Sequence, residues 1–200
     1  MASKIFIGVR GLFFFIQGNL IAFFRYDRKY LKGKYFKGRL GGICTIGWEW
    51  VVKDFWGGVF SPSINTVKAP WPTSPKVHIG NWSNLEFDIN DLHIFQTYGT
   101  YFQALDGKIK IGKGAWIAPN VGIITSNHNL LNLEERSQGR DVIIGENCWI
   151  GMNAVILPGV ILGSNTVVGA GAIVTKSFPL GNCVIAGNPA KLVKYIEFDK

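Results

Sequence analysis

Cysteine and histidine are scarce in this chain of 200 residues, which contains three of each. An odd number of cysteines without a framework spacing excludes a disulfide scaffold and predicts buried free thiols in a reducing compartment. The histidines do not have the spacing of zinc ligands, so we expect no metal site. The residues concerned are Cys44, Cys148 and Cys183, and His78, His93 and His128.

Acidic residues are nearly absent from the first 39 positions, where Asp27 is the only acid beside nine basic residues. The difference, 9 − 1 = +8, equals the formal net charge of the whole chain. The remaining 21 − 9 = 12 basic and 13 − 1 = 12 acidic residues cancel. We therefore expect no nucleic-acid partner, because the main part of the chain is neutral and the basic residues of the arm are interleaved with apolar ones.

A long uninterrupted apolar run is also missing. Residues 5–24 are just long enough to span a bilayer, but Arg10 near their middle would cost about 2.5–3.5 kcal/mol. No small-residue cleavage site follows, which argues against a signal peptide. We expect residues 1–39 to form an apolar and basic arm, a helix or hairpin in the membrane interface, with its basic residues facing anionic lipid. The alternative is that the apolar stretch packs against its own domain or a neighbouring subunit.

Residues 40–76 are rich in tryptophan and proline, and we expect them to form an extended connector. Ile43 and Ile46, with glycines nearby, suit a short strand. The prolines exclude a central strand or a helix in the second half of the segment. The tryptophans either pack in the core, which is their more common use, or stack on sugar rings. These residues are Pro62, Pro70, Pro72 and Pro75, and Trp48, Trp50 and Trp56.

From Ile111 to Pro179 an aliphatic residue recurs every six positions, with one interruption. A period of six fits neither a helix of 3.6 residues per turn nor an alternating strand. It predicts a solenoid of short strands ending in tight turns, with the aliphatic residue pointing inward and asparagines in the left-handed conformation at the corners. The aliphatic positions are Ile111, Ile117, Ile123, Ile144, Ile150, Ile156, Leu162, Val168 and Val174; the asparagines are Asn120, Asn147, Asn153 and Asn165.

The interruption of the repeat lies between Ile123 and Ile144. The distance is 144 − 123 = 21 residues, which is one unit of six plus fifteen extra residues. A loop that long inside a regular solenoid is usually functional. We place it at residues 129–143, directly after His128. The irregular coils expected before Ile111 can build a pocket for an acceptor.

Several motifs resemble those of the hexapeptide-repeat acyltransferases: IAPNV with the histidine and loop after it, IGENCWIG, PGV, VVGAGAIVTK and AGNPAK. The similarity is closest to the galactoside, maltose and nodulation-factor acetyltransferases and covers roughly residues 105–195. It implies an all-β fold, a left-handed parallel β-helix over residues 77–190, followed by a tail or short helix at 191–200. It also implies a homotrimer in which each loop helps to wall the active site of the next subunit.

His128 is the predicted general base. A hydroxyl group is a weak nucleophile until its proton is being removed, so its attack on a thioester requires a base. A neutral imidazole can accept that proton at cellular pH. The resemblance implies the same role for His128, with direct transfer and no covalent enzyme intermediate. We expect Glu134, Glu135 or a backbone carbonyl to orient the imidazole.

The acceptor side of the site is predicted at three residues. Asp106 matches an acidic position that contacts the acceptor sugar in the resembled family. Asn127 is expected to contact the acceptor or to orient the base, unless it is a corner residue. Trp149 matches a tryptophan that lines the active-site cleft, and its alternative use is packing on the outer face.

The donor implied by the resemblance is acetyl-CoA. Gly169 and Ala170 belong to a run of small residues that leaves a slot for pantetheine, whose amides can hydrogen-bond the backbone there. Thr175 and Lys176 follow this run, and Lys191 comes after the next turn. A lysine can bind phosphate as a point charge, although the family often has arginine where Lys191 stands.

We therefore expect an acetyl-CoA-dependent O-acetyltransferase that modifies a hydroxyl group of a saccharide, such as a capsular or O-antigen precursor. Its expected location is the cytoplasm, at the inner face of the cell membrane if the arm binds lipid. Alternatives within the enzyme class are N-acetylation of an amino sugar and O-acetylation of serine. Alternatives of another class are a non-catalytic sugar-binding β-helix and a γ-type carbonic anhydrase, which requires three histidines on zinc.

Overall fold

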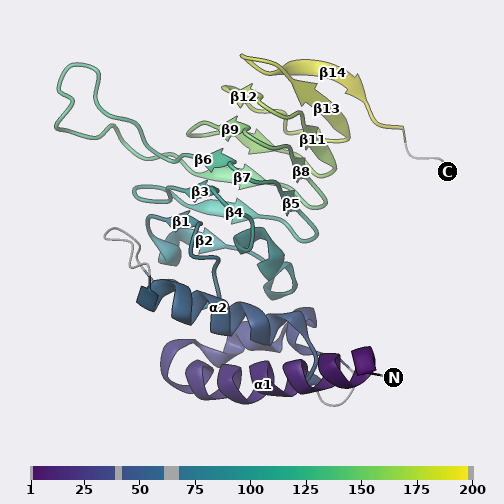
Figure 1. Ribbon diagram of the computed structural model, residues 1–200. Helices are drawn as coiled ribbons and strands as arrows, with labels where there is room; N and C mark the ends of the chain where they lie inside the picture. The colour runs from purple at the N-terminus through teal and green to yellow at the C-terminus, as the bar shows by residue number, and fades with distance from the viewer. Residues whose placement is uncertain (1, 39–41, 61–67, 198–200) are drawn as a thin grey trace. The chain divides into compact units, whose positions relative to one another are not determined.

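The structure is a computed structural model that describes residues 2–38, 42–60 and 68–197. The chain divides into two compact units, residues 1–75 and residues 76–200. The first unit is built on helices and the second on short strands (Figure 1). The helices of the first unit are α1 (Ala2–Arg25), η1 (Arg28–Lys32), η2 (Lys34–Phe36) and α2 (Ile46–Phe60), of which η1 and η2 are 3-10 helices.

The helices α1 and α2 pack around Trp48, which is almost fully buried. The centroid of its ring lies 5.5 Å from that of Phe15 and 5.1 Å from that of Phe36, both in edge-on geometry. A Cβ atom at Gly18 would lie 2.9 Å from the Trp48 ring, so α1 needs a glycine at this position. The core of this unit therefore depends on a few large aromatic side chains.

A part-buried polar pair, Tyr26 and Asp54, joins the end of α1 to α2, and Thr73 joins the segment after α2 to it. The Tyr26 hydroxyl donates to Asp54 Oδ2 at 2.5 Å, and Thr73 N donates to the same oxygen at 3.2 Å. Burial raises the pKa of the Asp54 carboxyl and that of the Tyr26 hydroxyl. Trp71 is fully buried and contacts the Tyr30 ring at 4.9 Å between centroids, so the proline-containing segment at residues 68–75 is part of the first unit.

The expected extended connector at residues 40–76 is wrong over Ile46–Phe60, which form α2. The short strand expected at Ile43 and Ile46 is wrong too, because Ile43 lies in a turn and Ile46 begins the helix. Trp48, Val51 and Val52 are buried at helical spacing, which explains why a helix forms. Residues 68–75 form neither helix nor strand, as expected. Pro62 lies outside the described residues.

The N-terminal arm contains a helix, one of the two expected forms. Over the described ranges, no helix is long and apolar enough to cross a bilayer. The prediction of buried thiols is confirmed for Cys148 and Cys183 and wrong for Cys44, which is exposed. Burial raises the pKa of the Cys148 thiol.

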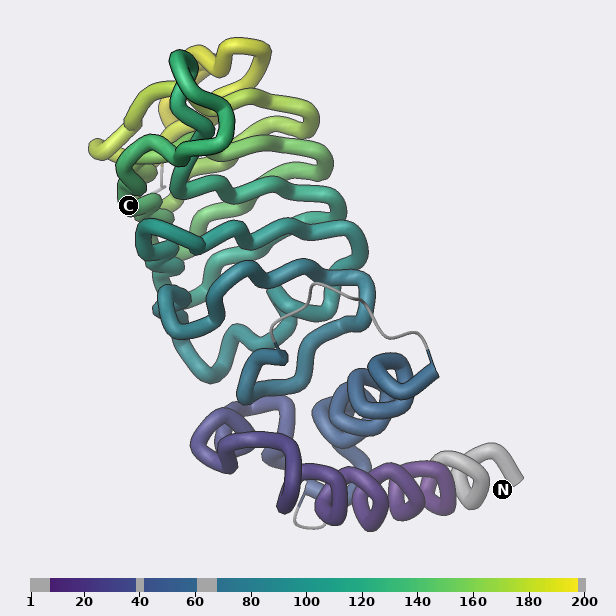
Figure 2. Tube along the Cα trace, turned by 90° about the vertical axis from the view of Figure 1, so that its left-hand side faces the viewer, coloured from purple at the N-terminus to yellow at the C-terminus, as the bar shows by residue number. Residues whose placement is uncertain are grey.

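The second unit is a left-handed parallel β-helix, whose stacked coils are visible in Figure 2. The chain visits three sheets in turn, and every neighbouring pair except the last is parallel. Sheet A contains β1 (His78–Ile79), β3 (Tyr101–Phe102), β6 (Gly122–Ile123), β9 (Val155–Ile156) and β12 (Ile173–Val174). Sheet B contains β2 (Leu85–Glu86), β4 (Ile109–Ile111), β7 (Val142–Ile144) and β10 (Ile161–Leu162). Sheet C contains β5 (Trp116–Ile117), β8 (Trp149–Ile150), β11 (Thr166–Val168), β13 (Cys183–Ala186) and β14 (Lys191–Tyr195).

The repeat is confirmed as the core of the β-helix. All nine aliphatic positions are 5% exposed or less, and strand pairing stacks them in columns, for example Ile117 on Ile150. The corner asparagines are confirmed in the left-handed region, which tight corners require and asparagine tolerates. Their φ angles are 58° at Asn120, 53° at Asn147, 61° at Asn153 and 57° at Asn165.

The first coil of the β-helix is irregular, as expected. A 3-10 helix, η4 (Trp82–Asn84), lies between β1 and β2. A second one, η5 (Ile89–Phe95), lies between β2 and β3, where sheet C would have a strand. Asp88 caps η5 by accepting from Asn90 N, and Asp91 accepts from Gly114 N at 2.6 Å. These carboxylates therefore support the coil.

The end of the chain differs from the expected tail or helix. Strand β14 runs antiparallel to β13 and pairs with it from Lys191 to Tyr195. Residues 198–200 lie outside the described part.

Candidate active site

The loop between β6 and β7 is a hairpin that projects from the corner between sheets A and B (Figure 1). Its two arms are held by backbone hydrogen bonds from Ser137 N to Asn127 O (2.8 Å) and from Asn129 N to Glu135 O (2.9 Å). Between these pairs, His128 and Arg136 form an antiparallel bridge. Strand β7 begins at Val142, two residues earlier than the predicted end of the loop implied. The base of the loop is therefore ordered, and His128 lies in it.

The His128 side chain is exposed, and its Nδ1 atom lies 2.7 Å from the carbonyl oxygen of Leu133. A carbonyl oxygen can only accept a hydrogen bond, so the proton of the neutral ring is on Nδ1. Nε2 then keeps its lone pair and is the nitrogen that can accept a proton. Of the three expected orienting groups, the backbone carbonyl makes this contact, rather than Glu134 or Glu135.

Asp106 lies in the same cluster as His128. Its Oδ2 atom accepts from Ser126 Oγ at 2.7 Å and from Arg136 Nη1 at 3.4 Å. Ser126 precedes His128 by two residues, and Arg136 is the bridge partner of His128. Among the described residues, only Oδ2 has such partners, so Oδ1 of this exposed carboxylate can accept from a hydroxyl group of a ligand. Asn127, also exposed, completes the cluster.

Two residues that were not predicted hold this cluster in place. The Gln103 side-chain oxygen accepts from the backbone amides of Thr125 and Ser126, both at 2.9 Å, and both of these residues are buried. A Cβ atom at Gly139 would lie 2.0 Å from the carbonyl oxygen of Asp106, so the returning arm of the hairpin needs glycine there. Gln103 lies in the irregular coils predicted before Ile111, but the sequence assigned it no role. No sequence signal marked Gly139, and both residues act on chain segments outside the regular repeat.

Thr175 and Lys176 lie at the same corner as His128. They directly follow β12, and His128 follows β6; the two strands are separated in sheet A by β9 alone. Two interstrand spacings of about 4.8 Å put the ends of β6 and β12 about 10 Å apart. Both side chains are exposed. The structure therefore brings a predicted donor-binding cation and the predicted base to one edge.

Gly169 and Ala170 lie at the next corner, between β11 and β12. Gly169 N donates to the carbonyl of Ile185 and Gly171 N to that of Met152, both at 2.8 Å. These two backbone N–H groups are therefore used within the coil. The contact of Gly169 and Ala170 with pantetheine stays a prediction. Ala170 remains exposed at the turn.

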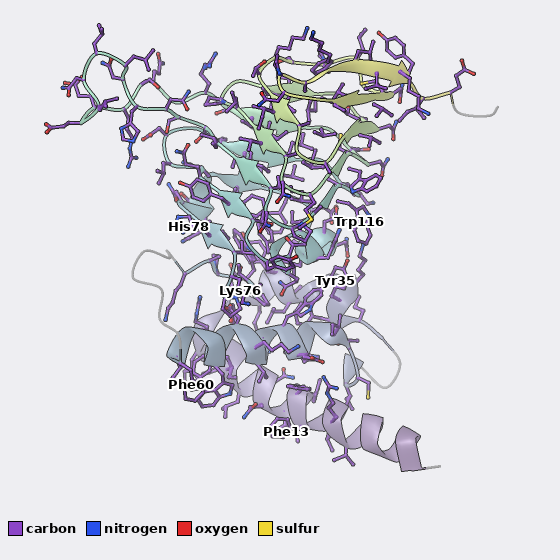
Figure 3. The ribbon with its side chains drawn as sticks, turned by 45° about the horizontal axis from the view of Figure 1, so that its top comes forward. Phe13, Tyr35, Phe60, Lys76, His78 and Trp116 are labelled. Carbon is purple, nitrogen blue, oxygen red and sulfur yellow. The ribbon has the colours of Figure 1, made fainter. Side chains whose placement is uncertain are left out.

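Trp149 and Lys191 lie on sheet C, in β8 and at the start of β14. Trp149 is 56% exposed and is aligned with Trp116, which is 61% exposed. The side chain of Trp116 stands on the outer face of the sheet (Figure 3) and contacts the His93 ring at 4.3 Å between centroids. Trp149 therefore belongs to an exposed aromatic face, and one chain does not bring it to the corner that holds His128.

The three histidines are dispersed over the second unit. His78 contacts the ring of Tyr101 at 4.9 Å between centroids, His93 contacts Trp116, and His128 contacts the Leu133 carbonyl. Within the described ranges, no group of three or more His, Cys, Asp or Glu side chains is placed to hold a metal ion.

Comparisons with known proteins agree with the β-helix fold. Residues 141–176 match the family described as bacterial transferase hexapeptide, with six repeats. A candidate acetyltransferase of Dictyostelium discoideum is 43% identical over 130 residues, which are 62% of this chain and 67% of that protein. A candidate acetyltransferase of Saccharomyces cerevisiae is 48% identical over 61 residues, which are 28% of this chain and only 31% of that protein.

One solved structure covers nearly the whole chain. It is a galactoside acetyltransferase in complex with coenzyme A, with 25% sequence identity and a TM-score of 0.54. The similarity covers 92% of this chain and 81% of that chain.

Proposed function

This chain belongs to the hexapeptide-repeat acyltransferases, and from that premise we propose that it transfers an acetyl group from acetyl-CoA to a hydroxyl group of a saccharide. The relative in complex with coenzyme A supports the donor, and its name supports a sugar as acceptor. The observation that carries the proposed reaction is the contact of His128 Nδ1 with the Leu133 carbonyl, because it leaves Nε2 able to accept a proton.

In the proposed reaction, the acceptor oxygen attacks the carbonyl carbon of the thioester while Nε2 of His128 takes the hydroxyl proton. The C–S bond breaks, and the sulfur of coenzyme A leaves with the electron pair. The imidazolium then returns its proton to this sulfur, which restores the base and releases a free thiol. A general base of this kind contributes a factor of about 10²–10⁴ to the rate.

Asp106 and Asn127 are the proposed acceptor contacts. Oδ1 of Asp106 faces no described protein donor, whereas Oδ2 is held by Ser126 and Arg136. A carboxylate fixed by one oxygen can accept from a sugar hydroxyl through the other without losing its orientation. This arrangement suits an uncharged polyhydroxyl acceptor next to Nε2 of His128.

Thr175 and Lys176 are the proposed donor contacts, at the same edge as His128. Lys176 supplies a positive charge for a phosphate group, and Ala170 is a small exposed residue on the way to it. Lys191 is the proposed second cation. These residues suit an elongated, anionic donor that follows the edge of sheet A and reaches Lys191 on sheet C.

We infer that the active form is a homotrimer whose sites are shared between copies. Trp149 lies on sheet C, so its role at the site requires sheet C of a second copy. The hairpin tip supports this, because Leu130 and Leu131 are almost fully exposed there. Light scattering of the intact protein should give three times the mass of the chain; a monomer with full activity would contradict the shared site.

The test of the proposed function is a thiol-release assay with acetyl-CoA and a panel of saccharides, followed by mass spectrometry of the products. His128→Ala should lower the rate about 10²–10⁴-fold with unchanged thermal stability, since the side chain is exposed. Glu134→Ala, in the same hairpin, is the matched control and should retain activity. Retained activity of His128→Ala would refute the base.

The products also separate the alternatives. An acetyl ester is lost in mild alkali, whereas the amide formed on an amino sugar is stable. Thiol release that depends on serine would indicate a serine O-acetyltransferase. Binding of sugars with no thiol release would indicate a non-catalytic β-helix.

A further inference from the structure

The outward face of α1 is apolar along its whole described length. Its seven large side chains are each between 47% and 79% exposed. In most surface helices this face is charged or polar, and the apolar stripe faces the core. The residues are Val9, Leu12, Phe13, Ile16, Leu20, Phe23 and Phe24.

These residues form one continuous stripe. A helix turns about 100° per residue, and at that step all seven lie within an arc of about 120°. Gly18 and Ala22 lie on the opposite side of the helix. Gly18 packs against Trp48 of α2, and Ala22 is buried. Figure 3 shows Phe13 on the side of α1 that is turned away from α2. The stripe is therefore not the face that builds the core of the first unit.

Polar residues border the stripe and do not interrupt it. Arg10 lies at its edge and pairs with Glu49 at 2.9 Å, so its charge is balanced within the unit. Asn19, at the opposite edge, donates to the carbonyl of Phe15 at 2.9 Å. A continuous exposed apolar stripe of this width is an interaction surface, because isolated monomers rarely leave one open to water.

A cluster of basic side chains follows the stripe directly. These residues are exposed, and Asp27 is the only acid in the first 39 positions. A lipid bilayer with anionic headgroups attracts such a cluster, and each basic residue near its surface raises the affinity about fivefold. The basic residues are Arg28, Lys29, Lys32, Lys34 and Lys37.

We propose that the outward face of α1 binds the surface of an anionic lipid bilayer, with the basic cluster on the headgroups. The helix then lies in the plane of the membrane, its stripe buried about 5–10 Å deep. It does not span the bilayer, since no described helix is long and apolar enough to do so. The proposal does not depend on the proposed enzymatic reaction.

A second copy of the chain suits this surface less well. Two identical stripes in contact would bring together two arms of 39 residues, each with a net charge of +8. Each arm contains a single acid, Asp27. Like charges at short distance repel, and the ion pairs of Arg10 with Glu49 and of Lys29 with Asp27 offset only part of this charge. An anionic bilayer buries the apolar face and also neutralises the positive charge.

The test is co-sedimentation of the full-length protein with vesicles of phosphatidylcholine mixed with phosphatidylglycerol, and with vesicles of phosphatidylcholine alone. The protein should bind the anionic vesicles and be released progressively by salt. Ile16→Glu with Leu20→Glu should weaken binding at least tenfold, because two apolar side chains of the stripe are then no longer buried in the membrane. Leu180→Glu, at a leucine of the second unit that is still more exposed, is the control and should bind as the unaltered protein does.

The charge is tested separately with Lys29→Ala and Lys32→Ala, which should weaken binding to anionic vesicles about fivefold each and leave binding to neutral vesicles unchanged. Circular dichroism of every variant checks that the helices are retained. The proposal is overturned if folded Ile16→Glu/Leu20→Glu still sediments with anionic vesicles. It is equally overturned if these substitutions change the oligomeric mass while the unaltered protein does not bind vesicles, since the stripe then serves as a protein contact.

Discussion

The two units of this protein are stabilised in opposite ways. In the β-helix, small and medium aliphatic side chains are stacked inside in columns, and backbone hydrogen bonds hold each coil to the next. In the helical unit, a few aromatic side chains fill the core, and a row of apolar ones remains outside. A solenoid distributes its stability over repeated contacts with neighbouring coils, whereas the helical unit concentrates it at few positions. The first unit is thus the more vulnerable to a single substitution.

The largest effect on this comparison is expected from Trp48→Ala. The substitution removes the ring between Phe15 and Phe36 and should destabilise the helical unit by about 3–5 kcal/mol. Hydrogen–deuterium exchange with mass spectrometry should show loss of protection in peptides of α1 and α2 and retained protection in the β-helix. Trp56→Ala, at a partly exposed tryptophan of the same helix, should have a smaller effect. Loss of protection in both units would show that they do not unfold separately.

The converse experiment is Ile150→Ala in the β-helix. Ile150 is fully buried between Ile117 and Val168 in sheet C. The cavity should cost about 2–5 kcal/mol, towards the lower end if neighbouring coils close around it. Exchange should increase in peptides of the adjacent coils, with α1 and α2 unchanged. The exposed Trp149 next to it provides the control, since Trp149→Ala should leave protection of the coils intact.

Gln103→Leu should destabilise the protein less than Trp48→Ala or Ile150→Ala does, but it should also lower the activity. Two buried backbone amides, those of Thr125 and Ser126, would lose their acceptor, which costs about 1–3 kcal/mol. Because these residues lead into His128, the base should lose its position, and the rate of thiol release should fall about tenfold or more. Gln138→Leu in the exposed hairpin should leave the rate unchanged. A normal rate in folded Gln103→Leu would show that the hairpin alone positions the base.

The smallest effect concerns a single corner. Asn153 has a φ angle of 61°, which costs about 1–2 kcal/mol for most other residues. Asn153→Ala should therefore lower the unfolding midpoint in urea slightly, whereas Asn153→Gly should not, because glycine adopts this conformation without strain. If Asn153→Ala and Asn153→Gly have equal unfolding midpoints, the left-handed backbone conformation is not the reason why this corner needs asparagine.

The sequence alone determined the solenoid, its inward positions, its corner asparagines and the place where the repeat breaks. These properties depend on a period of six, in which each residue contacts its equivalent one coil away. Tertiary structure decided that Ile46–Phe60 is helical, that the loop is a hairpin, and that the Leu133 carbonyl and Gln103 hold the segment around His128. It also decided that the apolar side of α1 faces outward, because the direction of a helix face depends on what packs against its other side. In a repeat, the contacts recur at a fixed spacing and can therefore be predicted from the sequence. Contacts between unlike segments that are distant in sequence follow no such pattern, so only the folded structure shows them.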